Sequence, residues 1–110
     1  MRVGVVGSRS INSLNLQDYL PENTTAIVSG GARGVDTCAR VYARAHGIPL
    51  LEFLPDYRQY GKKAPLRRNV TIVENSDFVL AFWDGASRGT MHTVQECEKQ
   101  GVPYRIIKIL

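Results

Sequence analysis

The sequence predicts an α/β protein with a three-layer, Rossmann-like fold and a five-stranded, mainly parallel sheet. Short apolar runs alternate with helical segments along the chain, and glycine-rich turns follow several of these runs. With 110 residues, 44% of them hydrophobic and 22% charged, the chain has the composition of one folded domain, which we place at 1–110. We expect the strand order 3-2-1-4-5, in which the first and fourth strands flank the point where the winding reverses.

The first half of the chain contains two strand–helix units. Residues 2–6 are an apolar strand closed by Gly7, and 11–20 are predicted to form a helix that stops at Pro21. Residues 25–29 are the second strand. The glycine-rich run 30–34 leads into an alanine-rich helix over 35–46, which ends at Gly47.

The second half continues the alternation. We predict a strand over 48–54, a loop over 55–64, and a helix over 65–75 that begins with Pro65. Residues 77–83 are almost entirely apolar, which indicates a central strand covered on both faces. A helix over 90–100 and a last strand over 104–109 complete the chain. Crossover helices must pack back onto the sheet, so this alternation favours parallel strands.

Three loops carry the residues that point to function. In a parallel sheet, the loops 7–10, 30–36 and 84–90 all leave the carboxyl edge, where ligands bind. Glycines and helix N-termini favour phosphate, and arginines add bidentate donors. One such loop alone is more typical of a tight turn, but three loops with an arginine each favour a phosphorylated ligand. The predicted ligand-binding residues are Gly7, Ser8, Arg9, Ser29, Gly30, Gly31, Arg33, Gly34, Asp36, Arg68, Asn69, Ser87, Arg88, Gly89 and Thr90.

Arg68, Asn69 and Asp36 each have two interpretations. Asn69 falls on the apolar stripe of the predicted 65–75 helix, with Arg68 at the border of that stripe. These two residues either tie the helix to a neighbouring loop or reach the ligand. Asp36 either interacts with the helix dipole, or accepts a ribose hydroxyl or orders Arg33.

Several classes of protein are disfavoured. The sequence contains no GxxxxGK[ST] motif, and its first strand is not followed by GxGxxG, which argues against a P-loop triphosphatase and an NAD dehydrogenase. Cys38 and Cys97 lack metal-ligand spacing, so we expect reduced thiols, no metal and no cofactor. No apolar run has the length of a membrane span, and the N-terminus lacks a signal core, so we expect a cytoplasmic protein.

The net charge of +4 is concentrated in one segment. Arg58, Lys62, Lys63, Arg67 and Arg68 follow one another without an intervening acid, which predicts either an anion-attracting patch or a solvated loop. Nearby tyrosines at 57 and 60, and Trp83, are suited to stacking on a base, although packing is the more common role for such residues.

Four short motifs together resemble one known family. Val5-Val6-Gly7-Ser8-Arg9, Val28-Ser29-Gly30-Gly31-Ala32-Arg33-Gly34-Val35-Asp36, Arg68-Asn69 and Gly89-Thr90 are similar to the YspA-like branch of the SLOG superfamily, which also contains DprA and the LOG phosphoribohydrolases. The resemblance spans nearly the whole chain, and GGARGVD is its most specific part. It implies a Rossmann-like fold that binds nucleotides or nucleotide-derived signals, often as a homodimer.

The resemblance leaves three functions open. LOG enzymes carry PGGxGTxxE, whose glutamate acts with a helix arginine to hydrolyse an N-glycosidic bond. Here Arg68 matches the arginine, but Thr93 stands at the glutamate position, with Glu96 and His92 as weak catalytic candidates. We therefore favour a sensor or sequestering module for a nucleotide-derived ligand. A nucleotide N-glycosidase and a DprA-like binder of single-stranded nucleic acid are the alternatives.

Overall fold

The computed structural model describes residues 1–109 and has one five-stranded sheet. All of its strand pairs are parallel, and their order is β3-β2-β1-β4-β5, which confirms the predicted fold class and order. The elements are β1 (Arg2–Gly7), η1 (Leu16–Asp18), β2 (Ala26–Ser29), α1 (Val35–His46), β3 (Leu50–Glu52), α2 (Tyr57–Tyr60), η2 (Gly61–Lys63), α3 (Ala64–Glu74), β4 (Phe78–Trp83), α4 (Arg88–Gln100) and β5 (Tyr104–Lys108).

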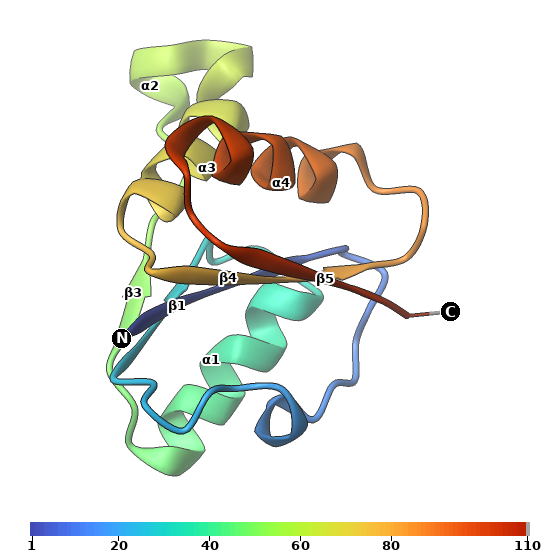
Figure 1. The fold of residues 1–110 in the computed structure, drawn as a ribbon. Coiled ribbons are helices and arrows are strands. Elements are labelled where there is room, and N and C mark those ends of the chain that lie inside the picture. Colours follow the sequence, from blue (N-terminus) through green and yellow to red (C-terminus); the bar gives the residue numbers. More distant parts are fainter. Residues whose placement is uncertain (110) are drawn as a thin grey trace.

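Helices cover both faces of the sheet. Figure 1 shows α3 and α4 on one face, and α1 with the segment between β1 and β2 on the other. The side chains of β1 alternate accordingly, because Val3 and Val5 pack in the α1 layer and Val6 packs in the α3 and α4 layer. β1 and β4 lie at the centre, and the apolar residues of β4 at 79–82 are fully buried.

The segment 11–20 is not a helix, contrary to the prediction. Only Leu16–Asp18 forms a 3-10 turn, capped by the Asn15 side chain, which accepts a hydrogen bond from Gln17 N at 3.2 Å. Asn and Ser side chains at 12, 13 and 15 compete with a helical ladder for backbone groups, which disfavours a continuous helix. The segment instead buries Ile11 and Leu16 beneath the sheet. The loop after β1 therefore contributes no helix N-terminus to the carboxyl edge.

The segment 55–64 is partly helical, although the sequence predicts a loop. The Asp56 side chain accepts a hydrogen bond from Gln59 N at 3.2 Å and so starts the one-turn helix α2. The 3-10 turn η2 follows and leads directly into α3. In Figure 1 this segment projects beyond the rest of the helical layer.

The remaining differences are small. α1 has the predicted bounds and ends at Gly47, which adopts the left-handed conformation with φ of 64°. α4 begins at Arg88, two residues earlier than predicted, and β3 is shorter than predicted at both ends. Cys38 and Cys97 are free thiols. Among residues 1–109, no helix combines the length and the apolar character that crossing a bilayer requires.

Candidate ligand-binding site

A cavity of about 550 Å³ opens at the carboxyl edge of the sheet. It lies where β1 and β4, the two strands at the reversal of the winding, send their chains to opposite sides. The loops after β1, β2 and β4 and the first turns of α1, α3 and α4 form its walls. The lining residues are Val6, Gly7, Arg9, Ser10, Ala32, Arg33, Asp36, Pro65, Leu66, Arg68, Asn69, Asp84, Ser87, Gly89, Thr90 and Thr93.

Ser8 holds the three loops together from beneath the cavity. Its amide donates to the Phe82 carbonyl at 3.0 Å, and its hydroxyl accepts a hydrogen bond from Asp84 N, also at 3.0 Å. Its carbonyl accepts a hydrogen bond from Val35 N at 3.4 Å. Ser8 is buried and is not among the lining residues, so it fixes the positions of neighbouring groups that do line the cavity.

The loop between β2 and α1 depends on two glycines. Gly34 has φ of 78°, and a Cβ there would lie 2.6 Å from the Arg9 Cα, so the β1 and β2 loops can approach only because this side chain is absent. At Gly30, a Cβ would lie 2.5 Å from Nη1 of Arg68. The glycines thus create the space in which the arginine side chain lies.

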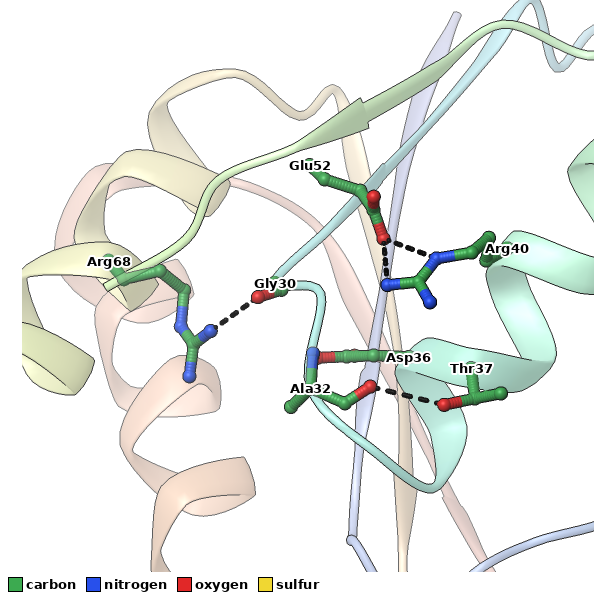
Figure 2. A network of polar contacts seen from close by, with 7 residues as sticks. All are labelled: Gly30, Ala32, Asp36, Thr37, Arg40, Glu52 and Arg68. Carbon is green, nitrogen blue, oxygen red and sulfur yellow. Dashed lines mark hydrogen bonds and ion pairs between the residues drawn. The ribbon is translucent and has the colours of Figure 1, made fainter. Parts of the chain in front are cut away.

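Arg68 reaches across from α3 and is held at two points. Its Nη1 donates to the Gly30 carbonyl at 2.7 Å, a contact drawn in Figure 2, and its Nε donates to Asn69 Oδ1 at 3.1 Å. Asn69 is buried, and its Nδ2 lies 3.2 Å from Nδ1 of His92 on α4. Arg68 therefore ties α3 to the β2 loop, as one of the two interpretations expects, and it also lines the cavity, whereas its contact with a ligand stays a prediction.

Burial dominates the electrostatics of Arg68 and Asp36. Burial lowers the pKa of Arg68, and the nearby Arg9 lowers it further, while Asp36 acts in the opposite direction. Burial raises the pKa of Asp36 above its usual value, against the hydrogen bond from Ala32 N at 3.0 Å and the attraction of Arg68. Ser29 Oγ is buried without a hydrogen-bond partner among the described residues, although it lies close enough to Asp36 to lower that pKa slightly.

The loop between β4 and α4 contributes the carboxylate of Asp84, which accepts three hydrogen bonds. Asp84 Oδ2 accepts a hydrogen bond from the Ser10 hydroxyl at 2.7 Å, and Oδ1 accepts from the amides of Ala86 and Ser87, both at 2.9 Å. These bonds lower the pKa of Asp84 to about 2, and the hydrogen bond from Ser10 has the largest effect. Ser87 then caps α4, because its hydroxyl accepts a hydrogen bond from Thr90 N at 3.3 Å.

Most of the predicted site residues gather around this cavity. Gly7, Arg9, Arg33, Asp36, Arg68, Asn69, Ser87, Gly89 and Thr90 line it, and Gly30 and Gly31 line a smaller hollow beside it. Four predicted residues line neither space, namely Ser8, Ser29, Gly34 and Arg88. The first three are buried beneath the loops, and Arg88 is exposed at the start of α4.

The weak catalytic candidates beyond Arg68 do not line the cavity. His92 contacts Asn69, which does line the cavity, and Glu96 accepts a hydrogen bond from Gln100 at 3.0 Å. Thr93, which stands at the position of the LOG glutamate, does line the cavity. Its hydroxyl donates to the Gly89 carbonyl at 3.2 Å.

Sequence reasoning missed several lining residues. Asp84 and Ser10 lie in loops already identified as functional. Their short distance in sequence from the ends of β4 and β1 could have identified them as lining residues. Pro65 and Leu66 form an apolar wall because they precede Arg68 by less than one helical turn. The sequence pattern places Leu66 in the apolar stripe of its helix, but Leu66 is exposed, whereas Ile72 and Val73 form the core contacts.

The arrangement is suited to holding an anion. Arg9, Arg33 and Arg68 face the cavity, and within residues 1–109 none of the three forms an ion pair. Of the two carboxylates in the walls, Asp84 accepts hydrogen bonds from three donors and Asp36 accepts one from a backbone amide. Guanidinium groups without a carboxylate partner offer free donors to a phosphate.

The fold and this cavity define a class, the Rossmann-like α/β proteins with a cavity at the switch point of the sheet. A sequence profile of the YspA, cpYpsA-related SLOG family matches residues 1–60, more than half of the chain. The chain therefore belongs to the YspA, cpYpsA-related SLOG family. The matched segment contains the β1 and β2 loops, while Arg68 and the β4 loop lie beyond it.

One curated relative has a similar sequence. The Gene 61 protein of Mycobacterium phage D29 is 40% identical to the chain over 83 residues. The match spans 70% of this chain and 66% of the phage protein, just under two thirds of that protein's length. No solved structure matches the chain.

Proposed function

We propose that this protein binds a nucleotide or nucleotide-derived phosphorylated ligand in the 550 Å³ cavity, as a sensor or sequestering module. The observation that carries the proposal is the Arg68 guanidinium, which is half-buried, held by Gly30 and Asn69, and without an ion-pair partner among the described residues. Asp36 attracts this half-buried cation without forming an ion pair with it, so burial of the charge is only partly compensated and a bound anion would stabilise it further. Membership of the SLOG family is consistent with this function.

The walls of the cavity support a ligand that combines a phosphate with an organic group. Arginines and glycine-rich turns line one part, and Pro65 and Leu66 form an apolar surface on another. The volume falls within the range of about 300–1,000 Å³ that is usual for small-molecule sites. A nucleoside monophosphate has both kinds of group.

Hydrolysis of an N-glycosidic bond is not part of the proposal. A general acid or base must be free to exchange a proton with the substrate. Three hydrogen bonds lower the pKa of Asp84 to about 2, far from the value that suits a general acid or base at neutral pH. Thr93 stands where LOG enzymes have a glutamate, and Glu96 does not line the cavity. The sequestering role needs only binding.

Isothermal titration calorimetry with adenosine monophosphate and adenosine tests the proposal. We expect the nucleotide to bind and adenosine to bind far more weakly, and Arg68→Ala to weaken nucleotide affinity by roughly tenfold or more, because hydrogen bonds to charged groups are lost. Arg44→Ala removes the same charge from an exposed position in the last turn of α1 and is the control, with unchanged affinity. Absence of nucleotide binding, or equal affinities for the two arginine variants, would refute the proposal.

A second candidate function, binding of single-stranded nucleic acid, is favoured by one exposed surface. We name it the basic-aromatic patch. It consists of Tyr57, Arg58, Tyr60, Lys62, Lys63 and Arg67. Tyr57 and Tyr60 are 58% and 37% exposed, and the Arg67 guanidinium lies 5.1 Å from the centre of the Tyr60 ring. Aromatic rings interleaved with cations are typical of surfaces on which bases stack.

Fluorescence anisotropy with a labelled oligothymidylate tests this second function. We expect binding that falls steeply as salt rises, and a further loss of about 1–3 kcal/mol in Tyr57→Ala. Thr37→Ala, at an exposed position on α1, is the control. If the oligonucleotide does not bind even at low salt, the patch is a solvated surface and this function is excluded.

A further inference from the structure

A second hollow of about 330 Å³ adjoins the proposed nucleotide cavity. Arg9, Ala32, Arg33 and Arg68 line both spaces, so the two hollows meet at a junction that these four residues form. Gly30, Gly31 and Pro55 complete the walls of the smaller hollow. Figure 2 shows Arg68 reaching from α3 toward the Gly30 carbonyl at this junction.

The junction concentrates positive charge. Its three charged residues are all arginines, and Arg9 is close enough to Arg68 to disfavour the charged form of that group. Arg68 is half-buried, and Arg9 and Arg33 are exposed at the rim. Like charges brought together repel, and the repulsion is relieved when anions lie between them. Arg9 and Arg33 each offer a guanidinium fork, and Arg68, whose Nη1 and Nε already donate within the protein, adds the donors of Nη2. Three guanidinium groups around one junction suit two adjacent phosphates.

The two hollows differ in the groups that they can hold. The larger hollow has the apolar surface of Pro65 and Leu66, which suits the nucleoside. The smaller hollow is lined by glycines, Ala32, Pro55 and arginines, and it has no aromatic or large aliphatic side chain to hold a base. It therefore suits a compact anion with several acceptor oxygens.

We propose that the ligand contains a diphosphate, as in a nucleoside diphosphate or a pyrophosphate-linked nucleotide, with the first phosphate in the larger hollow and the second in the smaller one. This inference rests on the proposed function and specifies its ligand. The nucleoside lies against Pro65 and Leu66, and the diphosphate crosses the junction between Arg9, Arg33 and Arg68.

Calorimetry with three adenine nucleotides in the presence of EDTA tests the inference. The probes are adenosine monophosphate, adenosine diphosphate and adenosine 3′,5′-bisphosphate, of which the last has two phosphates that are not adjacent. We expect the diphosphate to bind roughly tenfold or more tightly than the monophosphate, because the second phosphate gains charge-assisted hydrogen bonds. The bisphosphate should bind no more tightly than the monophosphate.

A pair of variants at Pro55 locates the second phosphate. Pro55 lines the smaller hollow and not the larger one. Pro55→Glu places a negative charge there and should reduce the diphosphate affinity to that of the monophosphate, whereas the neutral Pro55→Gln should keep the preference. Neither variant should change the monophosphate affinity.

The outcomes separate this inference from the function on which it rests. Equal affinities for monophosphate and diphosphate, or a bisphosphate that binds as tightly as the diphosphate, would overturn the inference and leave nucleotide binding intact. An unchanged diphosphate preference in Pro55→Glu would also overturn it. If none of the three nucleotides binds, the proposed function itself fails.

Discussion

At the scale of single residues, the position of Arg68 depends on a missing side chain. Its guanidinium occupies the space where a Cβ at Gly30 would lie, 2.5 Å from Nη1 and 2.9 Å from Cζ. The same arginine donates to the Gly30 carbonyl, so backbone and side chain fit together at this point. An arginine held in this way has already lost much of its conformational freedom before a ligand arrives, which favours tight binding.

Gly30→Ala should therefore weaken nucleotide binding. The new methyl group displaces the Arg68 guanidinium, and we expect a loss of affinity that approaches the loss in Arg68→Ala. Calorimetry on both single variants and on the double variant measures the coupling between the two positions. In the Arg68→Ala background the Gly30 substitution should have little further effect, and fully additive losses would contradict this account.

Asp84 makes the stability of the protein depend on pH at acid values. Its pKa is about 2 in the folded chain, against 3.8 for an unperturbed aspartate, so the ionised form is favoured by folding. The stabilisation is present above the unfolded pKa and is lost as the pH falls through the folded pKa. We expect Asp84→Asn to be less stable than the wild type at neutral pH and the difference to shrink toward about pH 2.

Urea unfolding at a series of pH values measures this difference. The free energy of unfolding of wild type and Asp84→Asn should converge as Asp84 becomes protonated. Asp18→Asn, at an exposed carboxylate in η1, is the control. A difference that stays constant across the acid range would show that the hydrogen bonds of Asp84 do not stabilise its charge.

At the scale of elements, the segment between β1 and β2 forms a turn whose Leu16 is buried in the core, where the sequence predicted a helix. Leu16 is fully buried and packs in the core cluster that includes Val3 and Ile27. A helix is therefore not required to cover this face of the sheet, because α1 covers part of it and a few apolar residues of the turn cover the rest. The turn should be correspondingly sensitive to loss of its anchor.

Leu16→Ala should destabilise the protein by about 2–5 kcal/mol, the usual cost of removing a buried leucine side chain. Leu66→Ala, at an exposed leucine, is the matched control and should have a far smaller effect on stability. Chemical unfolding monitored by circular dichroism provides both values. Equal stability losses in the two variants would contradict the assigned role of the turn.

The sequence predicted the elements that follow regular patterns. The 35–46 helix was correct at both ends, because a glycine-rich run precedes it and Gly47 ends it in the left-handed conformation. The 11–20 segment was predicted wrongly, because its apolar positions matched a helical period while its Asn and Ser side chains favoured turns. α2 was missed because a single turn capped by Asp56 leaves almost no periodic signal.

The sequence allowed prediction of those parts of the site that lie in the loops directly after the strands. Loops at the carboxyl edge of a parallel sheet must lie together, so Arg33 and Thr90 could be placed near one another from the sequence. Whether a side chain in such a loop faces the cavity or the interior depends on tertiary contacts. Ser8 faces the interior because its hydroxyl bonds to Asp84 N, a contact between residues far apart in the sequence.

At the scale of the whole molecule, the anion site and the basic-aromatic patch lie on neighbouring parts of one surface. Arg68 lines the proposed nucleotide cavity and also a third, smaller hollow, together with Tyr60 and Arg67. Much of the positive charge therefore lies near the proposed site, where it would favour the approach of an anionic ligand. Homodimer formation and a cytoplasmic location stay predictions, and sedimentation velocity would distinguish a 12.2 kDa monomer from a dimer.

Backbone amide chemical shifts recorded during titration with adenosine monophosphate test the central claim most directly. We predict shifts concentrated in residues 7–10, 30–36, 68–69 and 84–90, the segments that surround the cavity. Amides near Val41 and Tyr42, beside a separate hollow on α1, should not move. A spectrum that does not change, or shifts confined to the α1 hollow, would contradict the claim that the carboxyl edge of the sheet binds a nucleotide.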